Sequence, residues 1–305
     1  MTSVALKDFG SYRVGGRVHV VCDQPIQQVA FTASTHYTHN PNGHYCVESA
    51  YVQYFVPAQR NTLPPIVLLH GGGMSGSMWE NTPDGRPGWL HRLLHKGYEV
   101  HIIDNMERGR AGWLPNLWSG TPVSRTLEEA WTLFRLGKPE DFATRKAYPQ
   151  QQFPVSHLEN FGLGFVPRWT STSALQVKTL EALLQKLGQV ILLCHSQGGE
   201  IGFTAASQLP QCVAQLITIE PSGFCEQAKA LAHIPISIVY GDYLEHTDIW
   251  RTLRERWSSF SYTLKEHGAQ VQLIDLATVC PGASHFPMMD QASDQYLDAI
   301  LAKVA

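Results

Sequence analysis

The sequence has few charged residues and no block of one sign. Charged side chains make up 16% of the 305 residues, and the formal net charge is -3. Because lysines and arginines form no cluster, the basic surface expected of a protein that binds nucleic acid or an anionic membrane is missing. We therefore expect a small-molecule partner, with no nucleic acid and no membrane.

Long apolar runs and paired cysteine motifs are also missing. No segment approaches the roughly 20 apolar residues of a membrane span. The first thirty residues carry Lys7, Arg13 and Arg17 but no apolar core of the kind found in signal peptides. The six cysteines are scattered without a C-x-x-C, and a chain of this length does not need disulfides. These absences predict a soluble, cytoplasmic protein with free thiols.

Strand-like and helix-like segments alternate along most of the chain. Short apolar runs that are not interrupted by polar residues are typical of parallel strands covered on both faces. Such strands are expected at 64–73, 98–104, 189–196, 213–220, 235–242 and 271–278, with helices at 88–97, 171–188, 200–210 and 293–305. The alternation predicts a single α/β domain over residues 1–305, with a mostly parallel central sheet and helices on both faces.

Two regions depart from this alternation. Residues 15–21, 28–35 and 50–56 are typical of antiparallel strands at the edge of the sheet. Between Asp104 and the helix that begins near Ser171 lie about 65 residues that hold half of the eight tryptophans. A long aromatic segment at the carboxyl edge of a parallel sheet indicates a lid insertion, approximately 111–170. The alternative is an insertion that packs away from any site.

Ser196 stands between a predicted strand and a predicted helix, in "CHSQGG" (194–199). A sharp strand-to-helix turn exposes a nucleophilic serine, and small residues two before and two after it allow the close packing that the turn requires. Gly198 meets this need, and Cys194 is small enough to replace the usual glycine. The motif predicts a nucleophile elbow; the alternative is a serine that only caps the helix.

A glycine loop, "HGGGMSGSMWE" (70–80), follows an earlier strand. In hydrolases with such an elbow this loop supplies an oxyanion donor. Backbone N–H groups of Gly72 or Gly73, together with that of Gln197, are therefore candidates for an oxyanion hole. A phosphate-binding loop is the weaker alternative, because its lysine and its Ser/Thr are missing.

The base is expected to be a histidine beyond the last strand. His285, in "CPGASHFPMMD" (280–290), occupies that position. His195 and His246 are second choices: His195 is expected to face away from the serine next to it, and His246 lies in a stretch without a clear element.

Three carboxylates compete for the acid. Glu220 ends the strand next to the nucleophile strand, and a glutamate in the apolar "LITIEP" would be costly unless its charge is used. Asp242 and Glu245 follow the next strand, where many related hydrolases place the acid. The residues favour Glu220 and leave the other two open.

The combination of four motifs resembles the bacterial esterase 713-like branch of the α/β-hydrolase superfamily. They are "HGGGMSGSMWENTPDGRPGW" (70–89), "DNMERGR" (104–110), "CHSQGG" (194–199) and "IEP" (219–221). The resemblance implies an α/β-hydrolase fold, a Ser-His-Glu triad of Ser196, His285 and Glu220, and a homodimer. The family carries two adjacent cysteines where this chain has Gly72 and Gly73, so no disulfide of the oxyanion loop is expected here.

Two other clusters are interpreted as structural. Three histidines and Cys46 in "HYTHNPNGHYC" (36–46) match no zinc spacing, so we expect solvated side chains and no metal or cofactor. Asp104 and the arginines that follow it are expected to hold their loop by hydrogen bonds.

These features predict a cofactor-independent serine carboxylic ester hydrolase, an esterase or lactonase. The tryptophans of the insertion favour a small to medium apolar or aromatic ester or lactone. An amidase with the same mechanism is the alternative within the enzymes. A ligand-binding protein without activity on a hydrolase scaffold is the alternative outside them, because the fold alone does not determine function.

Overall fold

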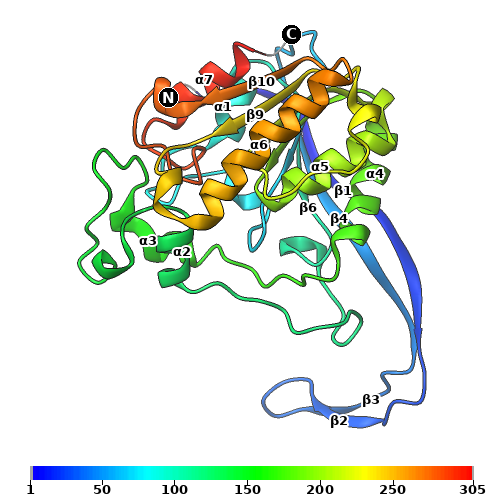
Figure 1. Cartoon of the computed structure of the whole chain (residues 1–305). Helices are drawn as coiled ribbons and strands as arrows, with labels where there is room; N and C mark the ends of the chain where they lie inside the picture. Colours follow the sequence, from blue (N-terminus) through cyan, green and yellow to red (C-terminus); the bar gives the residue numbers. More distant parts are fainter. Residues whose placement is uncertain (1–2, 304–305) are drawn as a thin grey trace.

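Within residues 3–303, which the computed structural model describes, eight strands form one twisted sheet (Figure 1). Their order is β1-β4-β6-β5-β7-β8-β9-β10. From β6 to β10 all neighbours are parallel, whereas β1 and β4 are antiparallel and form one edge. The bounds are β1 Leu6–Val21, β4 Gly43–Pro57, β5 Ile66–Leu69, β6 Val100–Asp104, β7 Val190–His195, β8 Val213–Ile219, β9 Ile236–Tyr240 and β10 Val271–Asp275.

Helices cover both faces of this sheet, as the uninterrupted apolar strands require (Figure 1). In β5, Val67 and Leu69 join the core under α4, α5 and α6, whereas Ile66 and Leu68 join the core under α1 and α7. The α-helices are α1 Trp89–His95, α2 Leu127–Leu133, α3 Leu158–Gly162, α4 Ser173–Leu187, α5 Gln197–Gln208, α6 Asp248–Glu266 and α7 Ser293–Leu301. Short 3-10 turns lie at Gly76–Trp79, Gly109–Ala111, Pro139–Asp141, Val155–His157, Pro210–Cys212, Ala228–Leu231, Leu244–His246 and Leu276–Thr278.

The predicted α/β fold and its six parallel strands are confirmed. The last predicted helix, 293–305, ends at Leu301, and residues 304–305 lie outside the described part of the chain. No element is predicted from the sequence for 248–266, yet this segment is α6, the longest helix of residues 3–303. Its buried side chains, among them Trp250, Leu253 and Trp257, form one narrow stripe between many charged residues.

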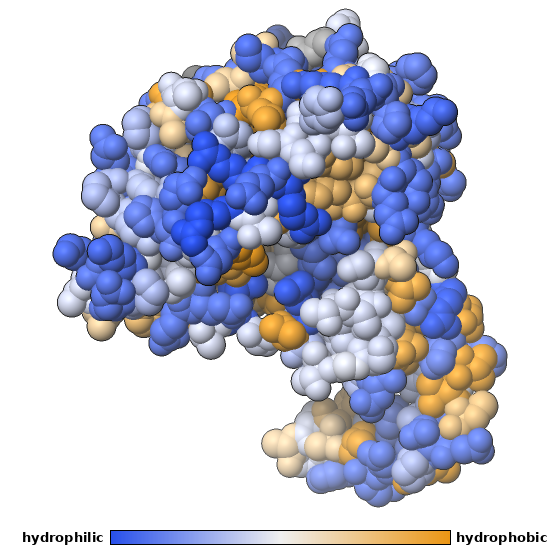
Figure 2. All heavy atoms as spheres, in the orientation of Figure 1, coloured by the Kyte–Doolittle hydropathy of each residue, from blue (hydrophilic) through white to orange (hydrophobic). Residues whose placement is uncertain are grey.

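The antiparallel edge is confirmed for 15–21 and 50–56, but the prediction for 28–35 is wrong. Because β1 already occupies the edge, this segment finds no place there, and β2 (Gln27–Ala30) pairs instead with β3 (His36–His39) in a separate ribbon. The β1–β4 hairpin continues past β6 and carries this ribbon away from the body (Figure 1). Apolar side chains are exposed on this arm (Figure 2), including Val18 at 58% and Phe31 at 73%.

The segment that joins β6 to α4 lies against the loops that follow β9 and β10. The backbone N–H of His285 donates to the Phe134 carbonyl at 3.3 Å, and that of Gln152 donates to the Gly282 carbonyl at 2.9 Å. In the part of the chain described, no helix is long and apolar enough to cross a membrane. All six cysteines are unpaired.

Candidate active site

Ser196 lies at the sharp turn between β7 and α5. Its φ of +53° falls where side chains other than glycine are strained, which is the conformation of an exposed nucleophile. The turn depends on close packing: a Cβ at Gly198 would lie 2.5 Å from the carbonyl oxygen of His70, and one at Gly199 would lie 2.5 Å from Cβ of Pro221. Both glycines are therefore required by the turn.

Cys194 fits the elbow because α5 makes room for it. Its side chain is fully buried, and its Sγ lies 2.4 Å from where a Cβ would stand at Gly202, one turn into the helix. The missing side chain at Gly202 thus compensates for the extra atoms at Cys194. The structure supports the expectation that only a small residue is needed before the serine.

The glycine loop lies beside the serine. A Cβ at Gly71 would stand 3.1 Å from Cβ of Ser196, so only a glycine permits this approach. Gly72 lines the same cavity as Ser196 and Gln197. Gln197 is the first residue of α5, so its N–H has no acceptor within the helix. Gly73 lies further on, where its carbonyl accepts from Val166 N–H at 2.9 Å.

A buried arginine supports this loop. Arg108 is fully buried and donates to the Gly71 carbonyl at 3.4 Å and to Oε1 of Gln197 at 3.3 Å. Its charge is balanced by Glu107 at 3.2 Å. Asp104 accepts from Gly76 N–H at 2.6 Å and from Arg110 N–H at 2.9 Å, so it holds the loop structure, as expected.

His285 follows β10 and is buried between aromatic rings. Its ring stacks on Phe134, with centroids 5.2 Å apart, and lies 4.6 Å from that of Trp250. Nε2 of His195 is 2.8 Å from the His285 carbonyl oxygen, so His195 positions the backbone of His285 instead of replacing it as a base. Burial lowers the pKa of His285, although Glu220 opposes that shift.

Glu220 follows β8 directly and makes contact with His285. One carboxylate oxygen contacts Nδ1 of His285, and the other accepts from Gly241 N–H at 2.8 Å. Its φ of +46° is strained, so both Glu220 and Ser196 occupy a rare backbone conformation. Burial alone would raise the pKa of Glu220, but Arg135 and His285 outweigh burial and lower it to about 2.

Arg135 comes from the segment between β6 and α4 and binds the same carboxylate. Its guanidinium is fully buried and donates from Nη1 to Glu220 at 2.9 Å, from Nη2 to the other oxygen, and from Nε to the Asp242 carbonyl at 2.6 Å. No sequence signal points to this residue, because a single arginine inside an insertion carries no motif.

The competing acids and bases lie elsewhere. Asp242 accepts from the N–H groups of Tyr243 at 2.8 Å and Gly282 at 3.1 Å, so it organises its own loop. Glu245 pairs with Arg254, and the ring of His246 stacks 4.5 Å from that of Tyr148. Residues 3–303 contain no group of three or more His, Cys, Asp or Glu side chains suited to a metal.

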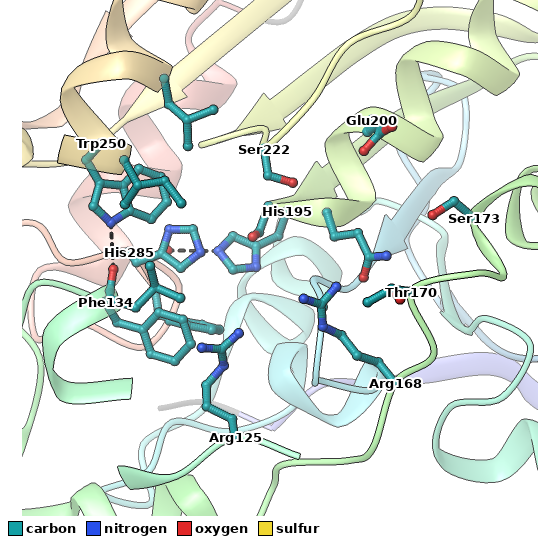
Figure 3. Close-up of a pocket in the computed structure, with 17 residues that line it drawn as sticks. Arg125, Phe134, Arg168, Thr170, Ser173, His195, Glu200, Ser222, Trp250 and His285 are labelled. Atoms are coloured by element: carbon teal, nitrogen blue, oxygen red, sulfur yellow. Dashed lines mark hydrogen bonds between the residues drawn. The ribbon is translucent and has the colours of Figure 1, made fainter. Parts of the chain in front are cut away.

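A cavity of about 420 Å³ joins these groups (Figure 3). Ser196, His285, Gln197 and Gly72 line it. One wall is apolar, and it is built from Leu133, Phe134, Ile249, Trp250, Leu253 and Phe286. The cavity can therefore hold a small organic molecule against the serine.

Comparisons with known proteins agree with the fold. A family model described as the alpha/beta hydrolase family matches residues 66–266. This chain belongs to the alpha/beta hydrolase family. The chain is also similar to a solved structure described as a novel bacterial esterase, with 30% identity and a TM-score of 0.86 over 99% of this chain and 96% of the other.

A curated relative is named "Probable secreted lipase phiG", from Fungal sp. (strain ATCC 74256). The two are 31% identical over 189 residues, which is 57% of this chain. The chain spans 49%, about half, of the length of that relative.

Proposed function

We propose that the protein is a serine carboxylic ester hydrolase that acts through Ser196, His285 and Glu220. The observation that carries the proposal is the contact between Glu220 and Nδ1 of His285 in a site where a half-buried serine with a strained backbone lines the same cavity as His285. This contact leaves Nε2 of His285 as the nitrogen available to the serine. A nucleophile, a base and an orienting acid are the parts that acyl transfer requires.

In the first half of the reaction, His285 removes the proton of Ser196 as Oγ attacks the ester carbonyl carbon. The N–H groups of Gly72 and Gln197 donate to the oxyanion that forms. His285 then gives its proton to the departing alcohol oxygen, which leaves an acyl-enzyme. In the second half, His285 activates water, which attacks the acyl carbon and releases the acid and the free serine.

Glu220 stays ionised throughout this cycle. Because Arg135 and His285 hold the pKa of Glu220 at about 2, the carboxylate keeps its charge and stabilises the imidazolium form of His285. The carboxylate also fixes the ring so that Nδ1 carries a proton. Arg135 provides the second charge that a buried carboxylate needs.

The cavity suits an ester or lactone of small to medium size. Residues from the 111–170 insertion, among them Leu133 and Phe134, form part of its wall. This supports a lid function for the insertion. A lactone needs the same attack on a carbonyl carbon, and its leaving alcohol stays attached to the acyl group.

The test is covalent labelling followed by a substrate panel. A fluorophosphonate is expected to label the folded protein once, on Ser196, and Ser196→Ala is expected to remove both labelling and hydrolysis. Acyl esters, aryl esters, lactones and aryl amides are then compared by kcat/KM. No labelling of folded protein would refute the esterase function, and a preference for amides would make the protein an amidase.

A further inference from the structure

Two arginines point into the catalytic cavity. Arg125 and Arg168 lie on the same side, with their guanidinium groups directed toward the space beside His195 and His285 (Figure 3). Catalysis as proposed above uses neither of them. Cationic side chains in a cavity whose other lining residues are mostly apolar or neutral need an explanation, because a partly buried charge is costly without a partner.

The two arginines are fixed relative to each other by the backbone. Val123 and Arg168 form an antiparallel bridge, with hydrogen bonds of 2.8 and 3.1 Å between their main chains. Arg125 lies two residues after Val123, so it is on the same side of its strand-like segment. Two segments of the insertion, near Val123 and near Arg168, therefore place the two guanidinium groups on the same side of the cavity.

Protein groups satisfy these two charges only in part. Nη1 of Arg125 donates to Glu129 at 2.6 Å, but Glu129 is half-exposed, and Nε of Arg125 is buried without a hydrogen-bond partner. For Arg168, no carboxylate of residues 3–303 lies within ion-pair distance of the guanidinium. Burial, opposed by Glu129 and reinforced by Arg168, lowers the pKa of Arg125.

The charged side of the cavity is next to the reacting atoms. Cδ of Arg168 would be 3.4 Å from a Cβ placed on Gly72, so its side chain lies along the oxyanion loop. Glu200, the single carboxylate of the lining, comes from α5 and lies away from Arg125 (Figure 3). Two guanidinium groups and one carboxylate leave the lining with an excess of positive charge.

We propose that the substrate is an ester that also carries a carboxylate, which Arg125 and Arg168 bind while the ester carbonyl reaches Ser196. The inference rests on the ester hydrolase function proposed above and narrows its substrate class from apolar esters to acid esters. Guanidinium groups bind carboxylates through paired, charge-assisted hydrogen bonds. The carbon chain between the two groups lies against the apolar wall of the cavity.

The experiment compares matched esters that differ only in charge. One pair consists of two 4-nitrophenyl esters: the monoester of adipic acid, and the ester of adipic acid monoamide. In this pair the charge is on the acyl side. The other pair is 4-carboxyphenyl and 4-carbamoylphenyl hexanoate, with the charge on the alcohol side. Each kcat/KM is divided by the rate constant for hydroxide-catalysed hydrolysis of the same ester, which corrects for intrinsic reactivity. In at least one pair, this normalised kcat/KM is expected to be about 10-fold or more higher for the acid than for the amide.

Substitutions assign this preference to the arginines. Arg168→Gln and Arg125→Gln are each expected to reduce the acid-to-amide ratio toward 1. The matched control is Arg145→Gln, in the same insertion, where Arg145 pairs with the exposed Glu159 at 2.7 Å and does not line the cavity. This variant is expected to keep the wild-type ratio.

The outcomes separate the two proposals. Hydrolysis of both neutral esters at least as fast as the acids would overturn the acid-ester inference and leave the esterase function intact. If Arg168→Gln lowers kcat/KM equally for the acid and the amide of a pair, Arg168 stabilises the oxyanion and does not bind a substrate carboxylate. That result would also overturn the inference. Calorimetry with Ser196→Ala measures binding without turnover, and equal affinity for acid and amide would overturn the inference even if no ester is hydrolysed.

Discussion

Arg135 and Glu220 form a fully buried ion pair, and the carboxylate oxygen that contacts His285 also accepts a hydrogen bond from Arg135 at 2.9 Å. The arginine comes from the segment between β6 and α4, whose Leu133 and Phe134 line the cavity, and the glutamate directly follows the central strand β8. The insertion thus supplies the positive charge that pairs with the acid of the proposed triad.

Replacing Arg135 with Gln is expected to lower the free energy of unfolding at neutral pH by about 3 kcal/mol, because a buried carboxylate loses a charged partner. Urea unfolding measures this change. Arg145→Gln is again the control: Arg145 pairs with a carboxylate that is 63% exposed, so less than about 1 kcal/mol is expected. Equal losses in the two variants would contradict the prediction.

Glu220→Gln is expected to lower kcat by about 100-fold or more, because the amide cannot stabilise the imidazolium of His285. Asp242→Asn is expected to change kcat by only a few fold, since Asp242 accepts from backbone N–H groups of its own loop. Steady-state kinetics on one activated ester measures both. The reverse order would make Asp242 the acid.

The pH profile of kcat/KM is expected to report His285. The base must be neutral, so activity falls as the pH falls through the pKa of His285, which burial places below 6.5. Glu220 raises this pKa and Arg135 lowers it. The acidic limb is therefore expected to move to lower pH in Glu220→Gln and to higher pH in Arg135→Gln. Shifts in the same direction would contradict the assignment.

Cys194 and Gly202 are expected to behave as a coupled pair. Gly202→Ala places a Cβ where the Cys194 Sγ leaves no room, and a loss of about 1–3 kcal/mol is expected. Adding Cys194→Gly is expected to recover most of that loss, with a coupling energy of about 1 kcal/mol or more in a double-mutant cycle. Additive effects would show that the thiol does not fill this space.

The sequence predicts the parallel strands well because their burial on both faces leaves uninterrupted apolar runs. It also predicts the positions of Ser196 and His285 in the fold, because each residue comes after a strand that can be recognised in the sequence. The acid is different: Glu220 and Asp242 both follow central strands, and only three-dimensional distance separates them.

The arginines could not be predicted in the same way. Arg135 and Glu220 are 85 residues apart in the sequence. Arg125 lies near Arg168 because Val123 forms a backbone bridge with Arg168. Such contacts depend on how an irregular segment folds back on the sheet, and no local periodicity encodes that path. The expectation of an apolar substrate follows from the tryptophans of this segment, but the segment lines the cavity with Leu133 and Phe134 and with the charged Arg125 and Arg168 instead.

The origin of Arg135 limits how this enzyme scaffold can be re-engineered or diversified. In many modular proteins a covering segment can be exchanged to change specificity while the catalytic core is left untouched. Here an exchange of all of 111–170 would also remove the counter-charge of Glu220. New specificities in this scaffold must therefore arise with Arg135 kept in place.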